Sequence, residues 1–326
     1  MIVLLSFLAC VIPTALYAGV IYWADQYEKE PWWLLSAAWL WGAIPSIILA
    51  FLLSALFSGS ITLITGQEFG ELADATVVAP LVEESVKGAA LLGILFFRRQ
   101  DIDSWLDGII YGAMVGLGFA MVENFFYFLS EYDSGGLSAW SLNVFYRAGV
   151  FGLNHALFTS MTGLGIALAR LSPRNRVRLA APVAGWAAAV SLHFIHNLTT
   201  SVLSGALSLL AVLNAWGGVL LTVGIIVWAL HQERTWIQTH LKEEVLNGTL
   251  TLNQYEIAGS QRRRFRQVWD TWRQQGFGRS RQVARFYQLC SKLAYQKQHD
   301  QRVASSPPST TAAQLREQIG YLGRQL

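Results

Sequence analysis

The sequence has little charge and almost no cysteine. Only 14% of its 326 residues are charged, whereas 53% are hydrophobic, and the mean hydropathy is +0.36. These values exclude an ordinary soluble enzyme and are typical of a membrane protein. The two cysteines, Cys10 and Cys290, are predicted to lie in different compartments, and neither belongs to a CxxC motif. A disulfide framework and a cysteine metal centre are therefore excluded.

Three further features are missing, and each narrows the class of protein. The first apolar segment has no basic residues before it and is long enough to span a bilayer, so it is predicted to be a membrane helix and not a cleavable signal peptide. No internal repeat of the kind common in transporters is found. No HExxH zinc-protease motif is present either.

Apolar windows of about 20 residues predict an all-α bundle of about seven membrane helices. They cover residues 2–23, 33–57, 75–97, 105–130, 146–170, 179–203 and 208–230. Basic residues follow the third, fifth and seventh spans, whereas the segments after the second, fourth and sixth contain no Lys or Arg before Arg147. By the positive-inside rule the N-terminus is expected outside and the C-terminus in the cytoplasm. We therefore expect a multi-pass integral membrane protein.

The chain divides by composition into a membrane region and a basic tail. Residues 1–230 carry a net charge of about −5, while residues 231–326 hold fifteen Lys/Arg and seven Asp/Glu, a net charge of about +8. We predict a membrane domain over 1–230, a basic and mostly helical cytoplasmic region over 231–304, and a linker with a short terminal helix over 305–326. The linker is the stretch SSPPSTT, residues 305–311.

The tail has a basic cluster beside two tryptophans. The cluster comprises Arg262, Arg263, Arg264 and Arg266, next to Trp269 and Trp272. Anionic lipid is one expected partner, and a solvated helical face is the alternative. Nucleic acid is not expected, since no base-reading motif accompanies the arginines.

Ionisable residues interrupt four of the predicted spans, where each is costly and marks a functional site by default. At 1.5 Å per residue, Glu84 lies about 21 Å above the cytoplasmic face and Glu123 about 27 Å. His193 and Asn197 lie at about 21 and 27 Å, and His155 lies about 13 Å below the outer surface. In a hydrocarbon core about 30 Å thick, all five fall in the outer half. The sequence thus predicts one polar layer.

Each of these residues also has a purely structural interpretation. Glu83 and Lys87 are spaced i,i+4 and can neutralise each other. Glu123, His155 and the second histidine of its span, His196, can serve as hydrogen-bonding residues between helices. Separate structural roles would not require these residues to lie at one depth, whereas a single site would. Their common depth therefore favours the functional interpretation. The role of His196 stays open.

The chemistry that fits this layer is hydrolysis. One version uses a divalent metal such as zinc, held by Glu123, His155 and His193, while Glu84 takes a proton from water. A metal-free version uses a glutamate to activate water, with His193 and Asn197 stabilising the oxyanion. The sequence leaves both versions open.

Several motifs occur in order along the chain. They are EExxK at Glu83-Glu84-Ser85-Val86-Lys87, FxxxE from Phe119 to Glu123, NHALFTSMTG around His155, and His193-Phe194-Ile195-His196-Asn197. An acidic loop, DQYEKEPWW, precedes them. Together they resemble the PrsW family of intramembrane proteases, which is related to the CAAX prenyl-protease and bacteriocin-processing group. The resemblance covers about residues 20–203, and Asn197 stands where the family motif HxxxD has Asp.

The resemblance implies a membrane-embedded peptidase whose catalytic residues are Glu83, Glu84, Lys87, Glu123, His155, His193 and Asn197. It further implies a location in a bacterial inner membrane. The implied reaction is site-1-type cleavage of a membrane-anchored protein such as an anti-sigma factor, a step of regulated intramembrane proteolysis. Two alternatives remain at this stage. One is a CAAX-type protease that processes prenylated or leader-bearing peptides, and the other is a proton-coupled transporter or receptor-like protein without enzymatic activity.

Overall fold

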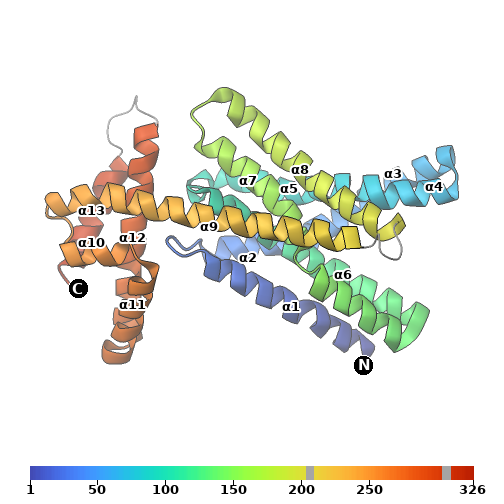
Figure 1. Ribbon diagram of the computed structural model, residues 1–326, viewed down its shortest axis with the longest axis horizontal. Helices are drawn as coiled ribbons and strands as arrows, with labels where there is room; N and C mark the ends of the chain where they lie inside the picture. Colours follow the sequence, from blue (N-terminus) through green and yellow to red (C-terminus); the bar gives the residue numbers. More distant parts are fainter. Residues whose placement is uncertain (203–208, 303–309) are drawn as a thin grey trace. The chain divides into compact units, whose positions relative to one another are not determined.

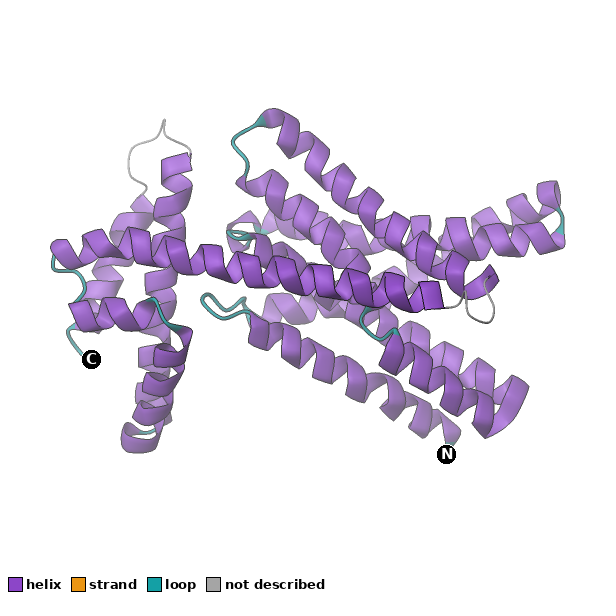
Figure 2. Cartoon of the chain, in the orientation of Figure 1, coloured by secondary structure: helices purple, strands orange, loops and turns teal. Residues whose placement is uncertain are grey.

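The structure is a computed structural model that describes residues 1–202, 209–302 and 310–326. Among these residues every regular element is a helix (Figure 2). Figure 1 labels the α-helices in chain order. They are α1 (Ile2–Ala24), α2 (Trp32–Trp41), α3 (Ile47–Thr65), α4 (Gln67–Ala73), α5 (Ala79–Phe97), α6 (Trp105–Val144), α7 (Asn154–Leu171), α8 (Asn175–Val202), α9 (Leu209–Leu246), α10 (Leu252–Ala258), α11 (Gln261–Gln275), α12 (Phe277–Arg302) and α13 (Thr310–Gly323).

Within the described part of the chain, five helical runs are long and apolar enough to cross a membrane, which confirms the all-α membrane fold. They are Ile2–Ala24, Trp32–Ile64, Trp105–Leu171, Asn175–Val202 and Leu209–Leu246. The run Trp105–Leu171 contains two of the predicted spans. Helix α5, the third predicted span, is not among the five because it carries three charged side chains. The count of seven spans and the orientation of the termini stay predictions.

The chain forms two compact units. The first consists of residues 1–24 and 30–225, and the second of residues 25–29 and 226–326. The short loop after α1 therefore belongs to the same unit as the tail, which the sequence did not indicate. The domain boundary at residue 230 stays a prediction, and the linker predicted over 305–311 lies, up to residue 309, outside the described residues.

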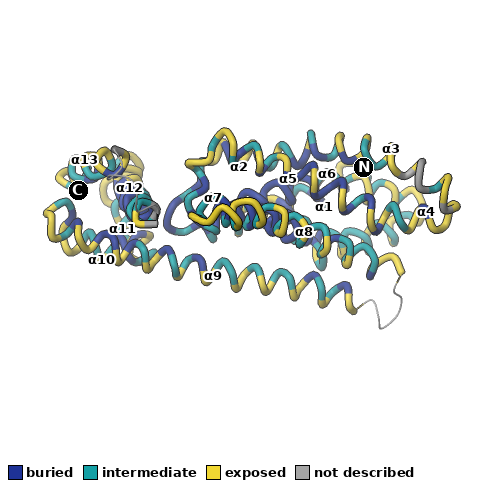
Figure 3. The backbone as a smooth tube through the Cα atoms, turned by 90° about the horizontal axis from the view of Figure 1, so that it is seen from above, coloured by how far each residue is buried: buried dark blue, intermediate teal, exposed yellow. Residues whose placement is uncertain are grey.

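In the first unit, the run Trp105–Leu171 forms the core. In its most apolar stretch, 83% of the residues are buried within the protein, whereas the share is 17% or less in the other four runs. Figure 3 colours the buried residues dark blue. Helix α6 begins with a capping box, in which the Ser104 hydroxyl accepts from the Asp107 backbone N–H and the Asp107 carboxylate accepts from the Ser104 N–H. This fixes the start of the helix that carries Glu123.

The segment between the fourth and fifth predicted spans is helical and not an extended loop. Gly136, with φ 68° and ψ −158°, breaks the helical path inside α6, and a π-helical stretch, Phe145–Val150, follows. Only glycine adopts such a positive φ readily. The chain therefore reverses direction without a loop, which the sequence analysis missed because Gly136 lies in an otherwise polar stretch.

Three glycines at four-residue spacing, Gly108, Gly112 and Gly116, allow α6 to pack closely against α7. A Cβ on Gly108 would lie 2.2 Å from the Gly163 carbonyl oxygen, and one on Gly112 would lie 2.5 Å from the Thr159 oxygen. A Cβ on Gly116 would lie 2.1 Å from the carbonyl oxygen of His155. The backbones of α6 and α7 thus touch along three turns, as small residues allow in membranes.

Replacing Gly108 with alanine is therefore expected to lower the stability of the protein by about 1–3 kcal/mol, because the backbones must separate. Thermal unfolding in detergent measures this change. Gly93→Ala in α5 is the matched control, since its Cβ would meet no atom of the described residues within 4 Å. It should leave stability unchanged or raise it by about 0.5–1 kcal/mol. Equal effects of the two substitutions would contradict the close packing of α6 on α7.

Candidate active site

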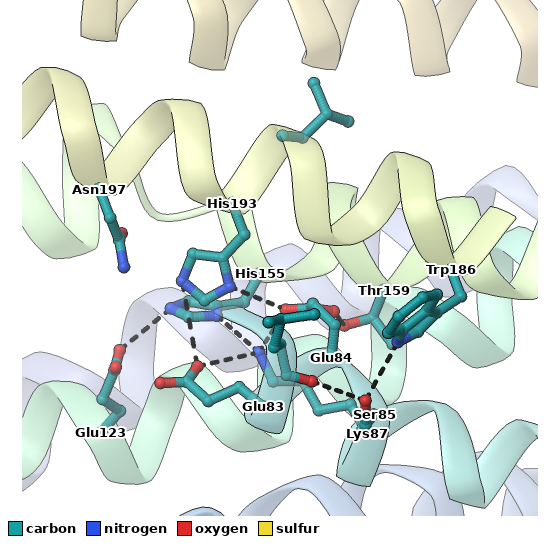
Figure 4. Close-up of polar contacts among 12 residues, drawn as sticks. Glu83, Glu84, Ser85, Lys87, Glu123, His155, Thr159, Trp186, His193 and Asn197 are labelled. Carbon is teal, nitrogen blue, oxygen red and sulfur yellow. Dashed lines mark hydrogen bonds and ion pairs between the residues drawn. The ribbon is translucent and has the colours of Figure 1, made fainter. Parts of the chain in front are cut away.

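Helix α5 places two carboxylates and an ammonium group inside the bundle. Glu84 and Lys87 are fully buried, and 12% of the Glu83 side chain is exposed. The Lys87 Nζ lies 2.7 Å from Glu84 Oε1 and 3.3 Å from Glu83 Oε2 (Figure 4). The self-neutralising pair considered from the sequence is thus a triad, and its stronger contact is with Glu84.

Helix α7 brings His155 to the same ammonium. The Lys87 Nζ lies 3.1 Å from His155 Nδ1, and on the other side of the ring His155 Nε2 lies 3.0 Å from Glu123 Oε2. Because an ammonium group only donates hydrogen bonds, Nδ1 must accept and Nε2 must carry the proton. His155 is therefore a neutral imidazole whose Nδ1 lone pair accepts from the Lys87 ammonium of α5.

Helix α8 contributes His193, which is 3% exposed. Its Nδ1 lies 3.1 Å from Glu84 Oε1, and its Nε2 lies 4.0 Å from Glu83 Oε2. The ring stacks on Phe158 of α7, with 4.9 Å between the ring centroids. If Nδ1 donates to the Glu84 carboxylate, the Nε2 lone pair is left facing Glu83.

Glu84 is held more tightly than Glu83. Besides the contacts with Lys87 and His193, it accepts a hydrogen bond from Thr159 Oγ1 at 3.1 Å. Thr159 was not predicted, although it lies one turn after His155 on the same face of α7. Glu83 has the single ion pair with Lys87 within 3.5 Å among the contacts of the described chain. Of the two carboxylates, Glu83 is therefore the one with room to reach a water molecule.

Glu123 lies at the edge of the cluster and not at its centre. Its Oε2 lies 2.5 Å from the Arg147 guanidinium, which also donates from Nε to Asn124 Oδ1 at 2.8 Å and lies 3.7 Å from the centre of the Tyr127 ring. Arg147 is a site residue that the sequence analysis missed. The available signal was its position, since it is a basic residue at the start of a span where the positive-inside rule expects none.

Two residues of α8 lie outside this network. Asn197 Nδ2 donates to the carbonyl oxygen of Ala75 at 2.8 Å, so its amide joins α8 to the segment before α5. His196 packs edge-on against Phe151, with 4.8 Å between ring centroids. Neither side chain has a hydrogen bond to Glu83, Glu84 or His155 in the structure.

The donor atoms at the centre of the site suit a cation. Glu83, Glu84, His155 and His193 each offer one oxygen or nitrogen, and these four atoms all lie within 4.8 Å of one another. The Lys87 ammonium contacts three of the four residues, which shows that these donor atoms can surround a positively charged group. Carboxylate and imidazole groups are also the ligands of catalytic zinc. Glu123, predicted as a ligand, does not belong to this group.

A multi-pass helical protein with buried carboxylates and imidazoles inside its bundle has the construction of a membrane-embedded enzyme. The profile of the PrsW family intramembrane metalloproteases matches residues 30–230, more than half of the chain. The chain therefore belongs to the PrsW family, which confirms the resemblance found in its motifs, and it is a multi-pass bacterial membrane protein.

Curated relatives agree with the family assignment. Protease PrsW of Clostridioides difficile (strain 630) is 36% identical over 126 residues, which are 38% of this chain and 51% of that protein. Protease PrsW of Geobacillus kaustophilus (strain HTA426) is 28% identical over 171 residues, 52% of this chain and 68% of that protein. Protease PrsW of Bacillus subtilis (strain 168) is 27% identical over 126 residues, 53% of that protein. No solved structure matches the chain.

Proposed function

We propose that this protein hydrolyses a peptide bond in a membrane-anchored protein substrate. The observation that carries the proposal is the meeting of two carboxylates and two imidazoles within 4.8 Å inside a membrane bundle. Each of these groups is energetically unfavourable when buried, and hydrolysis is a reaction in which every one of them has a role. Membership of a metalloprotease family supports the same reaction.

In this proposal Glu83 is the general base. It takes a proton from water while the water oxygen attacks the scissile carbonyl carbon, and it later gives that proton to the nitrogen of the departing amine. The sequence alone favoured Glu84 for this role. Glu84 is fully engaged by Lys87, His193 and Thr159, whereas the Glu83 side chain is partly exposed, so the contacts favour Glu83.

The other residues hold the reacting groups in place. Glu84, His155 and His193 would hold a divalent metal such as zinc, which supplies Lewis-acid polarisation of the scissile carbonyl when bound. Glu123 orients His155 through Nε2, in the way that carboxylates commonly orient ligating histidines. Lys87 balances the charge of Glu83 and Glu84. The metal-free version needs Asn197 at the oxyanion, and the Asn197 amide instead donates to Ala75.

The substrate is proposed to be a single-span protein cut near the outer end of its span, such as an anti-sigma factor. The depth of the polar residues in the predicted spans supports this position. The bilayer is the shared environment of enzyme and substrate, and anionic lipid at the basic tail is part of the proposal. The membrane domain over residues 1–230 is proposed to carry the whole catalytic site.

The test is reconstitution of the full chain in liposomes with a tagged single-span substrate. Mass spectrometry of the fragments is expected to place the cut in the outer half of the substrate span, and a metal chelator is expected to stop it. Capture of a prenylated or leader-bearing peptide by an inactive variant would favour the CAAX-type alternative. Proton flux through the liposomes without any cleavage would overturn the proposal in favour of a transporter.

A further inference from the structure

The basic cluster of the tail is divided between two faces of α11. The sequence grouped four arginines, but Arg264 is only 6% exposed and points into the second unit. Its guanidinium donates to the carbonyl oxygens of Ala258 at 2.8 Å and Tyr27 at 3.1 Å, and to the Ser291 hydroxyl at 2.9 Å. Helical periodicity turns this one arginine inward, so it is a core residue and cannot bind an external partner.

The outer face of α11 combines bare aromatic rings with arginines. Phe265 is 67% exposed, and Trp269 and Trp272 are each 46% exposed. The rings follow one another along the helix, with 6.4 Å between the centroids of Phe265 and Trp269 and 4.9 Å between those of Trp269 and Trp272. The same face carries three exposed arginines at helical spacing, Arg262, Arg266 and Arg273.

Chain connectivity keeps this helix near the membrane. Tyr27 is the third residue after Ala24, where the membrane helix α1 ends, so its backbone lies within about 10 Å of that end. Arg264 of α11 donates to the Tyr27 carbonyl oxygen, Gln288 Nε2 donates to the Lys29 oxygen at 3.2 Å, and Lys292 Nζ lies 2.6 Å from Glu28. Tryptophans typical of membrane interfaces flank the loop, namely Trp23 and Trp32, which are 70% and 75% exposed.

We propose that this face of α11 binds the headgroup layer of an anionic membrane, with Phe265, Trp269 and Trp272 inserted and Arg262, Arg266 and Arg273 on the lipid phosphates. An amphipathic helix with aromatic residues beside arginines is suited to lie in the interface plane. A second copy of this chain fits less well, because a two-fold contact through this face would bring its arginines together. The inference specifies the anionic-lipid partner included in the proposed function, and it does not depend on the proposed peptidase activity.

The first experiment measures the position of the face with a spin label on the full chain in nanodiscs. Phe265→Cys and, as a control on the opposite side of α11, Gln274→Cys supply the attachment points. The native cysteines do not interfere, since Cys10 is 2% exposed and burial raises the pKa of Cys290 to about 12. In discs of phosphatidylcholine with phosphatidylglycerol, the label at 265 should be relaxed by oxygen and protected from a water-soluble nickel complex. The label at 274 should show the reverse.

The second experiment tests the charge on that face. The double variant Arg262→Gln with Arg266→Gln is compared with the wild type through the label at 265. It should lower docking, the equilibrium ratio of membrane-bound to unbound α11, by about thirty-fold in the anionic discs, since each arginine near such a surface contributes about 1 kcal/mol. Arg281→Gln with Arg285→Gln is the matched control, because it removes two exposed arginines at the same spacing from α12 and should leave docking unchanged.

Two results would overturn the proposal. One is access of the nickel complex to position 265 in anionic discs. The other is protection of that position that depends on protein concentration and not on phosphatidylglycerol, which would assign the face to a second copy of the chain. Loss of cleavage with normal docking of α11 would contradict only the proposed peptidase activity. Loss of docking with normal cleavage would contradict only the proposed membrane binding by α11.

Discussion

Replacing Glu83 with glutamine is expected to reduce cleavage of a membrane-anchored substrate by at least about 100-fold and up to about 10,000-fold. The amide keeps the size and hydrogen-bonding capacity of the side chain, but it cannot take a proton from water. Among the described residues, the 3.3 Å contact with Lys87 is the one close ion pair of Glu83, so the variant should fold and still bind substrate. The measurement is the cleavage rate in liposomes, together with recovery of uncut substrate bound to the enzyme.

Two other glutamates provide the comparison. Glu68→Gln is the matched control in α4, where the side chain is exposed, and it should cleave at the wild-type rate. Glu84→Gln removes a carboxylate that contacts Lys87, His193 and Thr159, so it should lower both the cleavage rate and the unfolding temperature. If Glu83→Gln cleaves normally while Glu84→Gln is inactive but fully stable, the roles assigned to these two residues are wrong.

Replacing Lys87 with methionine is expected to destabilise the protein by about 3–5 kcal/mol, because Glu83 and Glu84 then lose their buried counter-charge. The substitution retains the length and apolar volume of the side chain, and it removes the ammonium that lies 4.0 Å from the centre of the Phe119 ring. A divalent metal ion should restore much of the lost stability by binding among the same carboxylates and imidazoles. Thermal unfolding in detergent, with and without zinc, measures both effects.

Arg98→Met is the control for this prediction. Arg98 pairs with Asp101 at 2.7 Å at the end of α5, but 38% of its side chain is exposed. Such a surface pair contributes about 0–1 kcal/mol, and zinc should not change the stability of this variant. A Lys87→Met protein as stable as the wild type would show that the ammonium does not hold the two carboxylates in place.

Much of the site is predictable from the sequence because its residues follow helical periodicity. Glu83, Glu84 and Lys87 share one face of a helix. A charged group in an apolar segment is energetically unfavourable, so each of them is identified as a candidate site residue. The i,i+4 spacing of Phe119 and Glu123 likewise puts both residues on one face of α6. Local spacing and burial cost were sufficient for these residues.

The remaining features depend on contacts between distant parts of the chain. Arg147 reaches Glu123 only because Gly136 reverses the path of α6, and no local pattern predicts that turn. The position of Glu123 beside His155, outside the central group of donors, likewise depends on how α6 and α7 pack. Arg264 looked like part of a surface cluster because only the folded tail shows that Tyr27 and Ser291 surround it.

The placement of the first loop in the core of the tail unit has a consequence for the order of synthesis. Tyr27 precedes its partner Arg264 by 237 residues. At about 5–20 residues per second, the ribosome takes roughly 12 to 47 s to supply that partner after the loop emerges. During this interval the membrane helices after α1 are made, while Tyr27 and Glu28 are not yet covered by the residues that bury them. The unit formed by the tail is therefore completed last, and it closes on one of the first segments to be synthesised.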